Sequence, residues 1–275
     1  MQKMKKGIIW LASYPKCGNT FVRAFISHYL FGDKKKLDFT LLKKIPKFEH
    51  KETFSKAIHN LESNTNFIYY KYCLEAQRNL INKFSQKELI FKTHHFYGKI
   101  NGYDFTNEQN TLFFIYLIRD PREVAVSYAS HSGISMEEQI EMFTGENKIN
   151  RVGYETKVNW MLSYKSWKSF KGVPSLFIKY EDLISDPINT FGSIIYLLSR
   201  NINIEYDRKK IENVLELIKF ENLQELEIKK GFEESMSGRF FRSGKIDSWK
   251  NVLSKNQVSK IENKFGDVMK ELGYL

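Results

Sequence analysis

The feature that most constrains the fold is an apolar run that passes through a short turn directly into a helix. Residues 7–13 (GIIWLAS) are apolar and rich in strand-forming side chains, which predicts a buried β-strand. Residues 20–31 repeat apolar side chains on one face at helical spacing: Phe21, Val22, Phe25, Ile26, Tyr29 and Leu30. Because the N–H groups at a helix N-terminus attract anions, this unit predicts an anion site in an α/β protein.

Further apolar runs predict more strands, with helix-period stretches between them. The strands are expected at 89–93, 111–118 and 174–180, and the helices at 121–131, 158–170 and 187–199. Asp120 and Pro121 suit the start of a helix, as its cap and its first-turn residue. Strands that alternate with helices predict a three-layer fold, in which a mostly parallel central sheet has helices on both faces.

The remaining stretches bear on domain organisation. Residues 33–60, 98–110 and 219–250 are polar and irregular, so we expect loops or lids there. The sequence has no internal repeat, low-complexity tract or linker, and 275 residues suffice for one large core. We therefore expect a single domain over residues 1–275.

Charge and cysteine content narrow the class of protein. The formal net charge of +11 favours an anionic ligand, although lysine-rich surfaces also serve solubility. Cys17 and Cys73 have no paired spacing, which argues against a disulfide framework or a zinc ribbon and favours the cytoplasm. The N-terminal apolar stretch is too short for a signal peptide, and the longest apolar run, LFFIYLI, is only strand-sized. We expect a soluble protein without a membrane span.

The turn SYPKCGNTF, residues 13–21, carries its lysine before its glycine. Loops that bind nucleoside triphosphates place Gly-Lys-Ser/Thr at their end, so Lys16 indicates a different anion. Gly18 permits a tight turn, and the helix is expected to begin at Asn19 or Thr20. The alternative is an ordinary strand–turn–helix corner with a surface lysine.

Cys17 lies in the same turn. A neighbouring lysine and a helix N-terminus both favour the thiolate, so we expect an accessible thiol of raised reactivity. A packed, inert cysteine is the alternative.

The strand at 89–93 is followed by two histidines. The carboxyl ends of parallel strands are where open α/β sheets bind ligands, so Lys92 and a histidine would face the same crevice as Lys16. Adjacent strand residues point to opposite faces, so only one of His94 and His95 can face it. Imidazole suits a general base, and no cysteine or carboxylate stands at ligand spacing to suggest a metal. A histidine that merely fixes the strand end is the alternative.

Two more basic stretches could bind phosphate. Arg119 ends the strand at 111–118 and Ser127 follows in the next helix, so a guanidinium and a hydroxyl could converge on one phosphate. Alternatively, Arg119 pairs with Asp120 and Ser127 only fills a helix face. Residues 239–251 (RFFRSGKIDSWKN) alone are typical of a solvated loop or a weak nucleic-acid patch.

Five segments, in order, resemble those of the sulfotransferases that use 3′-phosphoadenosine 5′-phosphosulfate (PAPS). They are YPKCGNTF, KTHH, LIRDPREVAVSY, FIKYEDLISDP and FFRSGKIDSWKN, and they span residues 8 to about 251. The resemblance implies a phosphosulfate loop of the P-loop-like kind and a catalytic histidine at His94, which directly follows Lys92-Thr93.

The resemblance also implies a role for each matching residue. Lys16 would hold the bridging oxygen of the phosphosulfate, and Lys92 would support the transferring group. The residues implied to contact the donor elsewhere are Cys17, Gly18, Asn19, Thr20 and Phe21 in the first segment, Arg119, Ser127 and Tyr180, and Arg242, Ser243 and Gly244.

The sequence departs from the family pattern at several of these positions. Phe21 replaces the usual adenine-stacking Trp, Cys17 replaces a Ser, and Ser243 replaces a Lys. Asp247-Ser248 replaces Gly-Asp, which changes the closure of the loop over the 3′-phosphate. The family's usual dimer motif, which would start at Lys250, is not present, so the oligomeric state stays open.

The predicted function is transfer of the sulfuryl group of PAPS to an acceptor hydroxyl, or to an amine, without a metal. The early lysine fits, because charge develops on the bridging oxygen when the S–O bond breaks. A P-loop kinase would need Gly-Lys-Ser/Thr and a strand-end Asp for Mg²⁺. A non-enzymatic anion- or RNA-binding protein is the other rival.

The acceptor is expected to be a small molecule or a glycan, carbohydrate-like or phenolic, and not a nucleic acid. Its pocket is expected to be built by residues 33–60, 98–110 and 132–157, which are rich in Tyr and Phe.

Overall fold

The centre of the molecule is a sheet of four parallel strands. The computed structural model describes residues 6–33, 36–58, 68–84, 88–145, 150–152, 155–235, 238–242 and 244–275. The strand order is β2-β1-β5-β8, with β1 at Ile8–Ser13, β2 at Leu89–Thr93, β5 at Thr111–Ile118 and β8 at Ser175–Lys179. Every neighbouring pair runs parallel, so the four predicted strands and their predicted direction are confirmed.

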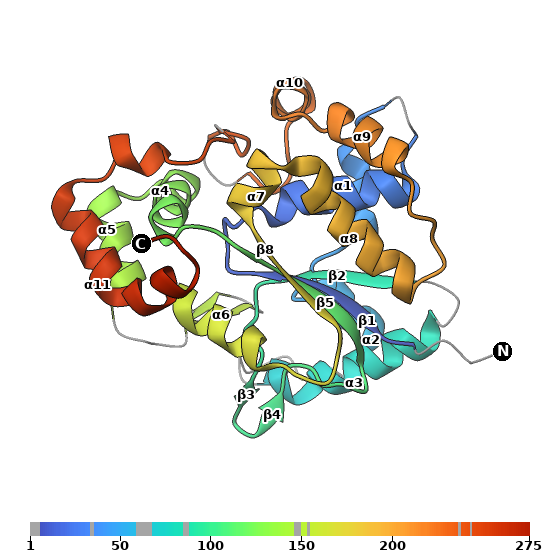
Figure 1. Ribbon diagram of the computed structural model, residues 1–275. Coiled ribbons are helices and arrows are strands. Elements are labelled where there is room, and N and C mark those ends of the chain that lie inside the picture. The colour runs from blue at the N-terminus through green and yellow to red at the C-terminus, as the bar shows by residue number, and fades with distance from the viewer. Residues whose placement is uncertain are drawn as a thin grey trace.

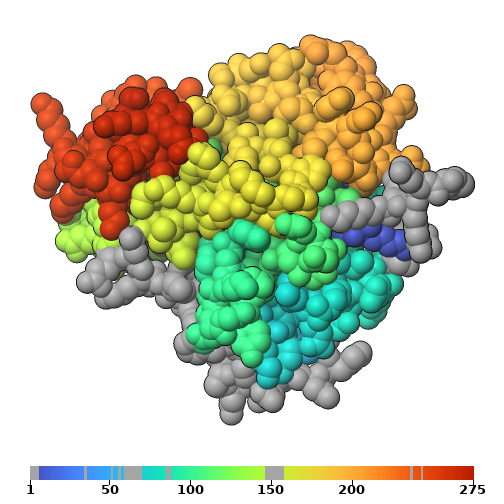
Figure 2. Space-filling view, turned by 60° about the horizontal axis from the view of Figure 1, so that its bottom comes forward, coloured from blue at the N-terminus to red at the C-terminus, as the bar shows by residue number. Residues whose placement is uncertain are grey.

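Helices cover both faces of this sheet (Figure 1). On one face lie α1 (Asn19–Phe31), α8 (Pro187–Asn201) and α9 (Arg208–Leu217), and on the other α3 (Ile68–Lys83) and α6 (Trp160–Ser169). A third group, α4 (Pro121–Ser132), α5 (Met136–Thr144) and α11 (Lys255–Glu271), packs together at one end. The predicted three-layer arrangement is confirmed. In Figure 2, α11 (red) forms one flank of the visible face, and α8 and α9 (gold to orange) form the other.

The segments expected to be loops contain regular structure, which corrects the prediction. Residues 33–60 include η1 (Phe39–Lys44) and α2 (Lys51–Ala57), and residues 98–110 include the hairpin β3 (Lys99–Ile100) and β4 (Tyr103–Asp104). Residues 219–250 include α10 (Phe220–Lys230) and η2 (Ser248–Asn251). The chain also forms α7 (Tyr180–Ser185), β6 (Asn150–Val152) and β7 (Glu155–Lys157). Short elements depend on packing more than on propensity, so their local sequence signal is weak.

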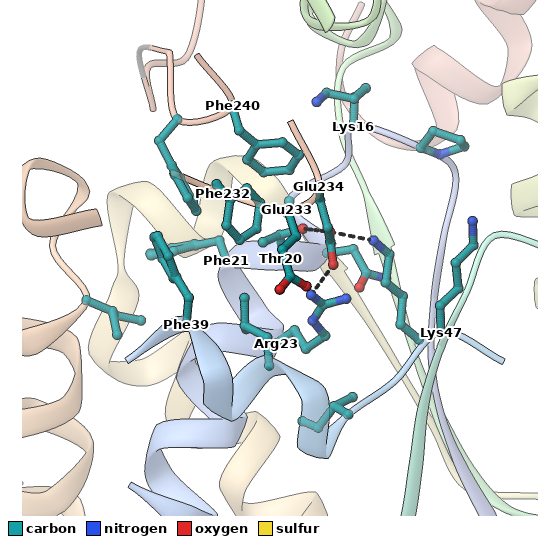
Figure 3. Close-up of a pocket in the computed structure, with 18 of the residues that line it drawn as sticks. Lys16, Thr20, Phe21, Arg23, Phe39, Lys47, Phe232, Glu233, Glu234 and Phe240 are labelled. Atoms are coloured by element: carbon teal, nitrogen blue, oxygen red, sulfur yellow. Dashed lines mark hydrogen bonds and ion pairs between the residues drawn. The ribbon is translucent and has the colours of Figure 1, made fainter. Parts of the chain in front are cut away.

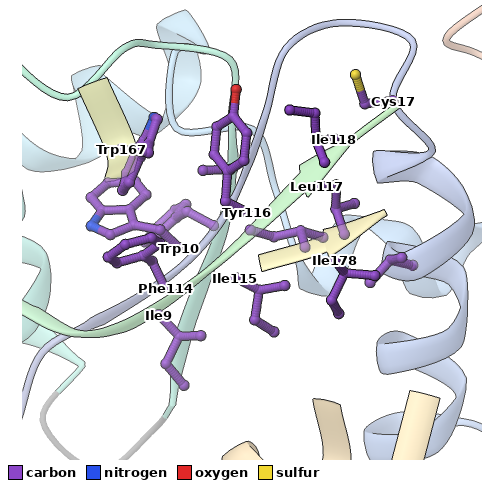
Figure 4. Packing of buried hydrophobic residues seen from close by; sticks show 14 of the residues in the cluster. Ile9, Trp10, Cys17, Phe114, Ile115, Tyr116, Leu117, Ile118, Trp167 and Ile178 are labelled. Atoms are coloured by element: carbon purple, nitrogen blue, oxygen red, sulfur yellow. The ribbon is translucent and has the colours of Figure 1, made fainter. Parts of the chain in front are cut away.

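The core fixes where each strand ends. All eight residues of β5 are buried, and in Figure 4 Trp10, Phe114 and Trp167 gather beside it, with ring centroids of Phe114 and Trp167 5.0 Å apart. The indole N–H of Trp167 donates to the backbone oxygen of His95 at 2.8 Å. This packing holds the polar residues after the strands at one edge of the sheet.

No helix in the described parts of the chain has both the length and the apolar character needed to cross a bilayer.

Candidate active site

A cavity of about 2400 Å³ opens at the carboxyl edge of the sheet. It brings together twelve of the fourteen predicted site residues: Lys16, Gly18, Asn19, Thr20, Phe21, Lys92, His94, Arg119, Ser127, Tyr180, Arg242 and Gly244. Of the other two, Cys17 lies beneath the loop and Ser243 lies outside the described residues. Residues of 38–53 and 132–142 also line the cavity, whereas the hairpin at 98–110 contributes none of the described lining residues. The hairpin packs against α3, so its predicted place in the acceptor pocket is wrong.

The turn before α1 has the backbone of an anion-binding loop. Lys16 and Gly18 both have positive φ, 68° and 87°, and α1 begins at Asn19 as predicted. A Cβ on Gly18 would come within 2.5 Å of the Tyr180 ring, so this turn requires glycine. The side-chain amide of Asn19 donates to Leu11 O at 3.0 Å and braces the turn. Gly18, Asn19 and Thr20 line the cavity, and the first N–H groups of a helix attract anions.

Cys17 is not an accessible thiol, so that prediction is wrong. Its side chain is fully buried, and burial raises the pKa of the thiol far above its ordinary value. The side chain lies under the loop near Ile118 (Figure 4), as part of the buried cluster, with Sγ 3.8 Å from Pro15 O. The structure therefore supports the alternative prediction, in which Cys17 is packed and inert.

Two lysines line the cavity, the half-buried Lys16 and the buried Lys92. Burial lowers the pKa of Lys16 to about 8, and repulsion from Lys92 and Arg119 adds to the effect. Burial also lowers the pKa of Lys92 to about 8. The ammonium group of Lys16 lies 4.3 Å from the centroid of the Phe240 ring. Both groups are therefore cations whose charge an arriving anion would stabilise.

The two histidines divide as expected. His94 lines the cavity, and its Nδ1 lies 2.9 Å from Ser13 O. Because a carbonyl oxygen only accepts, Nδ1 carries the proton, and Nε2 is the nitrogen that can take one. His95 is buried, with its ring 4.9 Å from that of Phe105 and its Nδ1 3.2 Å from the Tyr70 hydroxyl.

Glu49 holds this strand end and was missed from the sequence. Its buried carboxylate accepts the backbone N–H of His94 at 3.0 Å and that of His95 at 3.3 Å, and the hydroxyl of Thr93. Glu49 stands in a stretch expected to be a loop, where a single glutamate gives no signal of burial.

Arg119 is held at the other end of the cavity. Its guanidinium donates to Glu123 at 3.2 Å and to Lys245 O at 3.1 Å, and lies over the Tyr180 ring at 4.1 Å. Its buried Nε has no hydrogen-bond partner among the described residues. The alternative pairing with Asp120 is wrong, because Asp120 caps α4 and binds Arg122.

The C-terminal loop closes over this end. Gly244 has φ 63°, and a Cβ there would come within 2.6 Å of the Phe220 ring. The departure at Asp247-Ser248 has a structural use, since the Ser248 hydroxyl donates to Glu123 at 2.9 Å. The backbone N–H of Trp249 donates to the same carboxylate at 2.9 Å.

The sequence analysis missed a carboxylate in this cavity, Glu234, which lies next to Arg23 and Thr20 in Figure 3. Glu234 accepts from Lys92 Nζ at 3.2 Å and from the Thr20 hydroxyl at 3.3 Å, and it pairs with Arg23. Burial would raise its pKa, but the charges of Lys92 and Arg23 outweigh burial and lower the pKa to about 2. The cavity therefore has an anion position beside the loop, and a carboxylate fills it.

Comparison with known proteins gives the family. The profile of the sulfotransferase domain family matches residues 6–273. The chain belongs to this family. Cytosolic sulfotransferase 17 of Arabidopsis thaliana is 23% identical to this sulfotransferase. The alignment covers 99% of this chain and 77% of the Arabidopsis protein. Flavonol 3-sulfotransferase of Flaveria bidentis is 25% identical, with 92% and 79% covered.

Solved structures agree in fold. Retinol dehydratase in complex with androsterone and the inactive cofactor PAP superposes with a TM-score of 0.64, at 19% identity, covering 96% of this sulfotransferase and 80% of that chain. A mouse sulfotransferase complexed with PAP gives 0.60 at 18% identity, covering 97% and 86%. The predicted family, fold and sulfotransferase activity are confirmed.

The site of this sulfotransferase fits a donor with two anionic ends. The Glu234 carboxylate shows that an oxyanion can be held between Lys92, Thr20 and Arg23, and the buried Arg119 keeps an unused donor at the other end. Among the described residues, no group of three or more His, Cys, Asp or Glu side chains is placed to hold a metal ion.

Proposed function

We propose that this sulfotransferase moves the sulfuryl group of PAPS to the hydroxyl of a small acceptor, with His94 as the general base. The observation that carries the proposal is the convergence of Lys92 and His94, at the end of β2, with the Lys16 loop, which follows β1, on one cavity. Parallel strands make this convergence useful, because their carboxyl ends meet at one edge.

The residues around the cavity divide the binding of the donor. The backbone N–H groups at the start of α1, the Thr20 hydroxyl and Lys16 would hold the 5′-phosphosulfate. Arg119, Ser127, Arg242 and Gly244 would hold the 3′-phosphate. Phe21, which meets Phe191 edge-on at 5.4 Å, and Tyr180 offer aromatic surface to the adenine.

The chemistry then follows from the protonation of the side chains. His94 Nε2 takes the proton of the acceptor hydroxyl while the acceptor oxygen bonds to sulfur. The S–O bond to the 5′-phosphate breaks, and its electron pair stays on the phosphate oxygen, where the charge of Lys16 stabilises it. Lys92 stabilises charge on the sulfuryl oxygens. Positioning and preorganised charge supply the rate.

The remainder of the cavity favours an acceptor with apolar or aromatic surface. It is lined by Leu80, Phe84, Ile90, Ile134 and Met142. Retinol dehydratase has been solved with androsterone and with retinol, whose ring systems are of this kind. These observations support a phenolic or ring-containing hydroxyl compound. Relatives named cytosolic sulfotransferases support a cytoplasmic location.

The test is incubation with PAPS labelled in its sulfuryl group and a panel of phenols, alicyclic alcohols, sugars and amines. We expect label to transfer to ring-bearing hydroxyl compounds and PAP to be released in equal amount. Tight binding of polynucleotide with strong salt dependence, and no binding of PAP, would contradict the proposal.

A further inference from the structure

The carboxylate of Glu234 lies in the cavity between three hydrogen-bond donors, two from α1 and one from β2. Its Oε2 is 3.2 Å from Lys92 Nζ and 3.3 Å from Thr20 Oγ1, and its Oε1 pairs with the Arg23 guanidinium. Figure 3 shows Glu234 entering from the segment after α10, with Arg23 reaching up from α1. One anion thus occupies a cradle made by two cations and a hydroxyl.

Two of these donors, Lys92 and Thr20, are the ones that the proposed function assigns to the phosphosulfate. A carboxylate and a sulfuryl group share the feature that matters here, which is a pair of oxygens on one atom that accept hydrogen bonds side by side. The Thr20 hydroxyl has a single hydrogen to donate, and two anions in one cradle repel each other. Binding of the donor there would therefore displace Glu234.

Arg23 is left without its partner when this happens. It lies one turn after Thr20 in α1, its side chain is only 4% exposed, and its buried Nε has no hydrogen-bond partner among the described residues. A buried guanidinium that loses its counter-charge is costly unless another anion replaces it. Lys92 adds positive charge nearby, so the vacated position attracts an anion strongly.

We propose that Arg23 completes, with Lys92 and Thr20, a cradle for the sulfuryl end of the donor, and that Glu234 fills this cradle while no nucleotide is bound. The inference rests on the proposed function. It makes Arg23 a third contact to the transferring group, and it makes Glu234 an internal competitor of PAPS.

The position of Glu234 in the fold suits a replaceable occupant. It follows Gly231, which has φ 72° and ends α10, and its side chain is 32% exposed. The pKa of about 2 keeps the carboxylate charged at working pH, so the arrival of an anion, and not protonation, would displace it. Glu233 beside it pairs with Lys43 at the surface, at 2.8 Å, and provides a matched control.

The first experiment measures PAP and PAPS affinities by titration calorimetry without acceptor, for the wild type, Glu234→Gln and Glu233→Gln. Because Glu234→Gln weakens charge-assisted bonds in the filled cradle, we expect both nucleotides to bind about tenfold tighter or more. Glu233→Gln should leave both affinities within about twofold. Unchanged or weaker binding to Glu234→Gln would overturn the proposal.

The second experiment adds Arg23→Gln to the Glu234→Gln enzyme, so that the two lost charges do not leave one buried alone. We expect PAPS affinity to fall about tenfold more than PAP affinity, because only PAPS carries the sulfuryl group. Arg200→Gln on the exposed end of α8 is the control for losing an arginine. Equal losses for the two nucleotides, or an effect on acceptor binding alone, would overturn the role of Arg23.

The outcomes separate this inference from the proposed function. If the wild type binds no PAP, the proposed function fails. If the wild type binds PAP and the variants do not change as expected, only this inference fails. If the double variant does not fold, the Glu234→Gln result decides whether the cradle is occupied by a competitor.

Discussion

The two ends of the cavity each hold a buried arginine against a glutamate, yet the two pairs are built differently. At the 3′ end, Glu123 follows Arg119 by four residues in the strand–helix corner, and its side chain is 2% exposed. At the sulfuryl end, Glu234 reaches Arg23 across 211 residues of sequence, and its side chain is 32% exposed.

The remaining contacts of the two carboxylates explain the difference. Glu123 also accepts from the Ser248 hydroxyl and the Trp249 N–H, so it ties Arg119 to the C-terminal loop. Among the described residues, Glu234 accepts from Lys92, Thr20 and Arg23, which we propose as contacts of the donor. The Arg119–Glu123 pair therefore holds the C-terminal loop in place. The Arg23–Glu234 pair, in our proposal, occupies a binding position until the donor arrives.

The largest effect is expected between the two ends, at His94. His94→Ala removes the general base, so turnover should fall by roughly 10²- to 10⁴-fold while PAP affinity and folding stay near normal. Steady-state rates and calorimetry on the same preparation check this. A variant that binds PAP and still sulfates at a near-normal rate would sink the assignment.

His95 serves as a contrasting position for that experiment. Because its ring packs in the core against Phe105 and Tyr70, His95→Ala should lower stability rather than act on the chemical step.

The second prediction compares how much Glu123 and Glu234 each contribute to the stability of the fold. Glu123→Ala leaves Arg119 buried without a counter-charge and releases the C-terminal loop, so we expect a loss of about 3–5 kcal/mol in the free energy of unfolding. Glu234→Ala also removes the counter-charge of a buried arginine, Arg23, but water and buffer anions from the cavity can reach the vacated position, so we expect a smaller loss. Urea unfolding measures the free energy of unfolding of both variants. Equal losses would contradict the different structural roles of Glu123 and Glu234.

The third effect sharpens the assignment of the 3′ end. Arg119→Ala should weaken PAP binding about 10- to 150-fold, the worth of one charge-assisted hydrogen bond of roughly 1.5–3 kcal/mol. Binding of adenosine 5′-phosphate, which lacks the 3′-phosphate, should change far less. The ratio of the two affinities is the measurement, because it cancels a general loss of stability. If this ratio is unchanged from wild type, Arg119 does not bind the 3′-phosphate.

The smallest effect concerns pH at the sulfuryl end. The folded-state pKa values of Lys16 and Lys92, about 8, lie below the 10.5 of a free lysine, so between pH 8 and 10.5 the folded protein holds fewer protons than the unfolded chain. Free-enzyme stability from these groups therefore rises with pH across that window.

An anionic nucleotide favours the charged lysines, which gives the opposite sign for binding. PAP affinity should fall above pH 8, by up to about tenfold per pH unit for each lysine that must regain its proton. Calorimetry at pH 8.5 in buffers of different ionisation enthalpy should detect proton uptake. Binding without proton uptake would show that the lysines are already charged.

The elements that carry the site could be predicted from the order of amino acids. The apolar runs of β1, β2, β5 and β8 are contiguous, and a buried parallel strand leaves that pattern wherever it occurs. Gly18 and Asn19 mark the start of α1 through local backbone geometry alone. Lys92, His94 and Arg119 could be placed at one edge because parallel strands end there together.

The partners of these residues could not be predicted in this way, because they depend on how distant segments pack. Cys17 and Glu49 are buried because distant elements close over them, and a lone cysteine or glutamate carries no periodic signal of that. The pairing of Glu234 with Arg23 joins residues 211 positions apart. Strands and helices follow from the order of neighbours along the chain, whereas a buried ion pair depends on which surfaces the fold brings together. Local sequence patterns do not record that information.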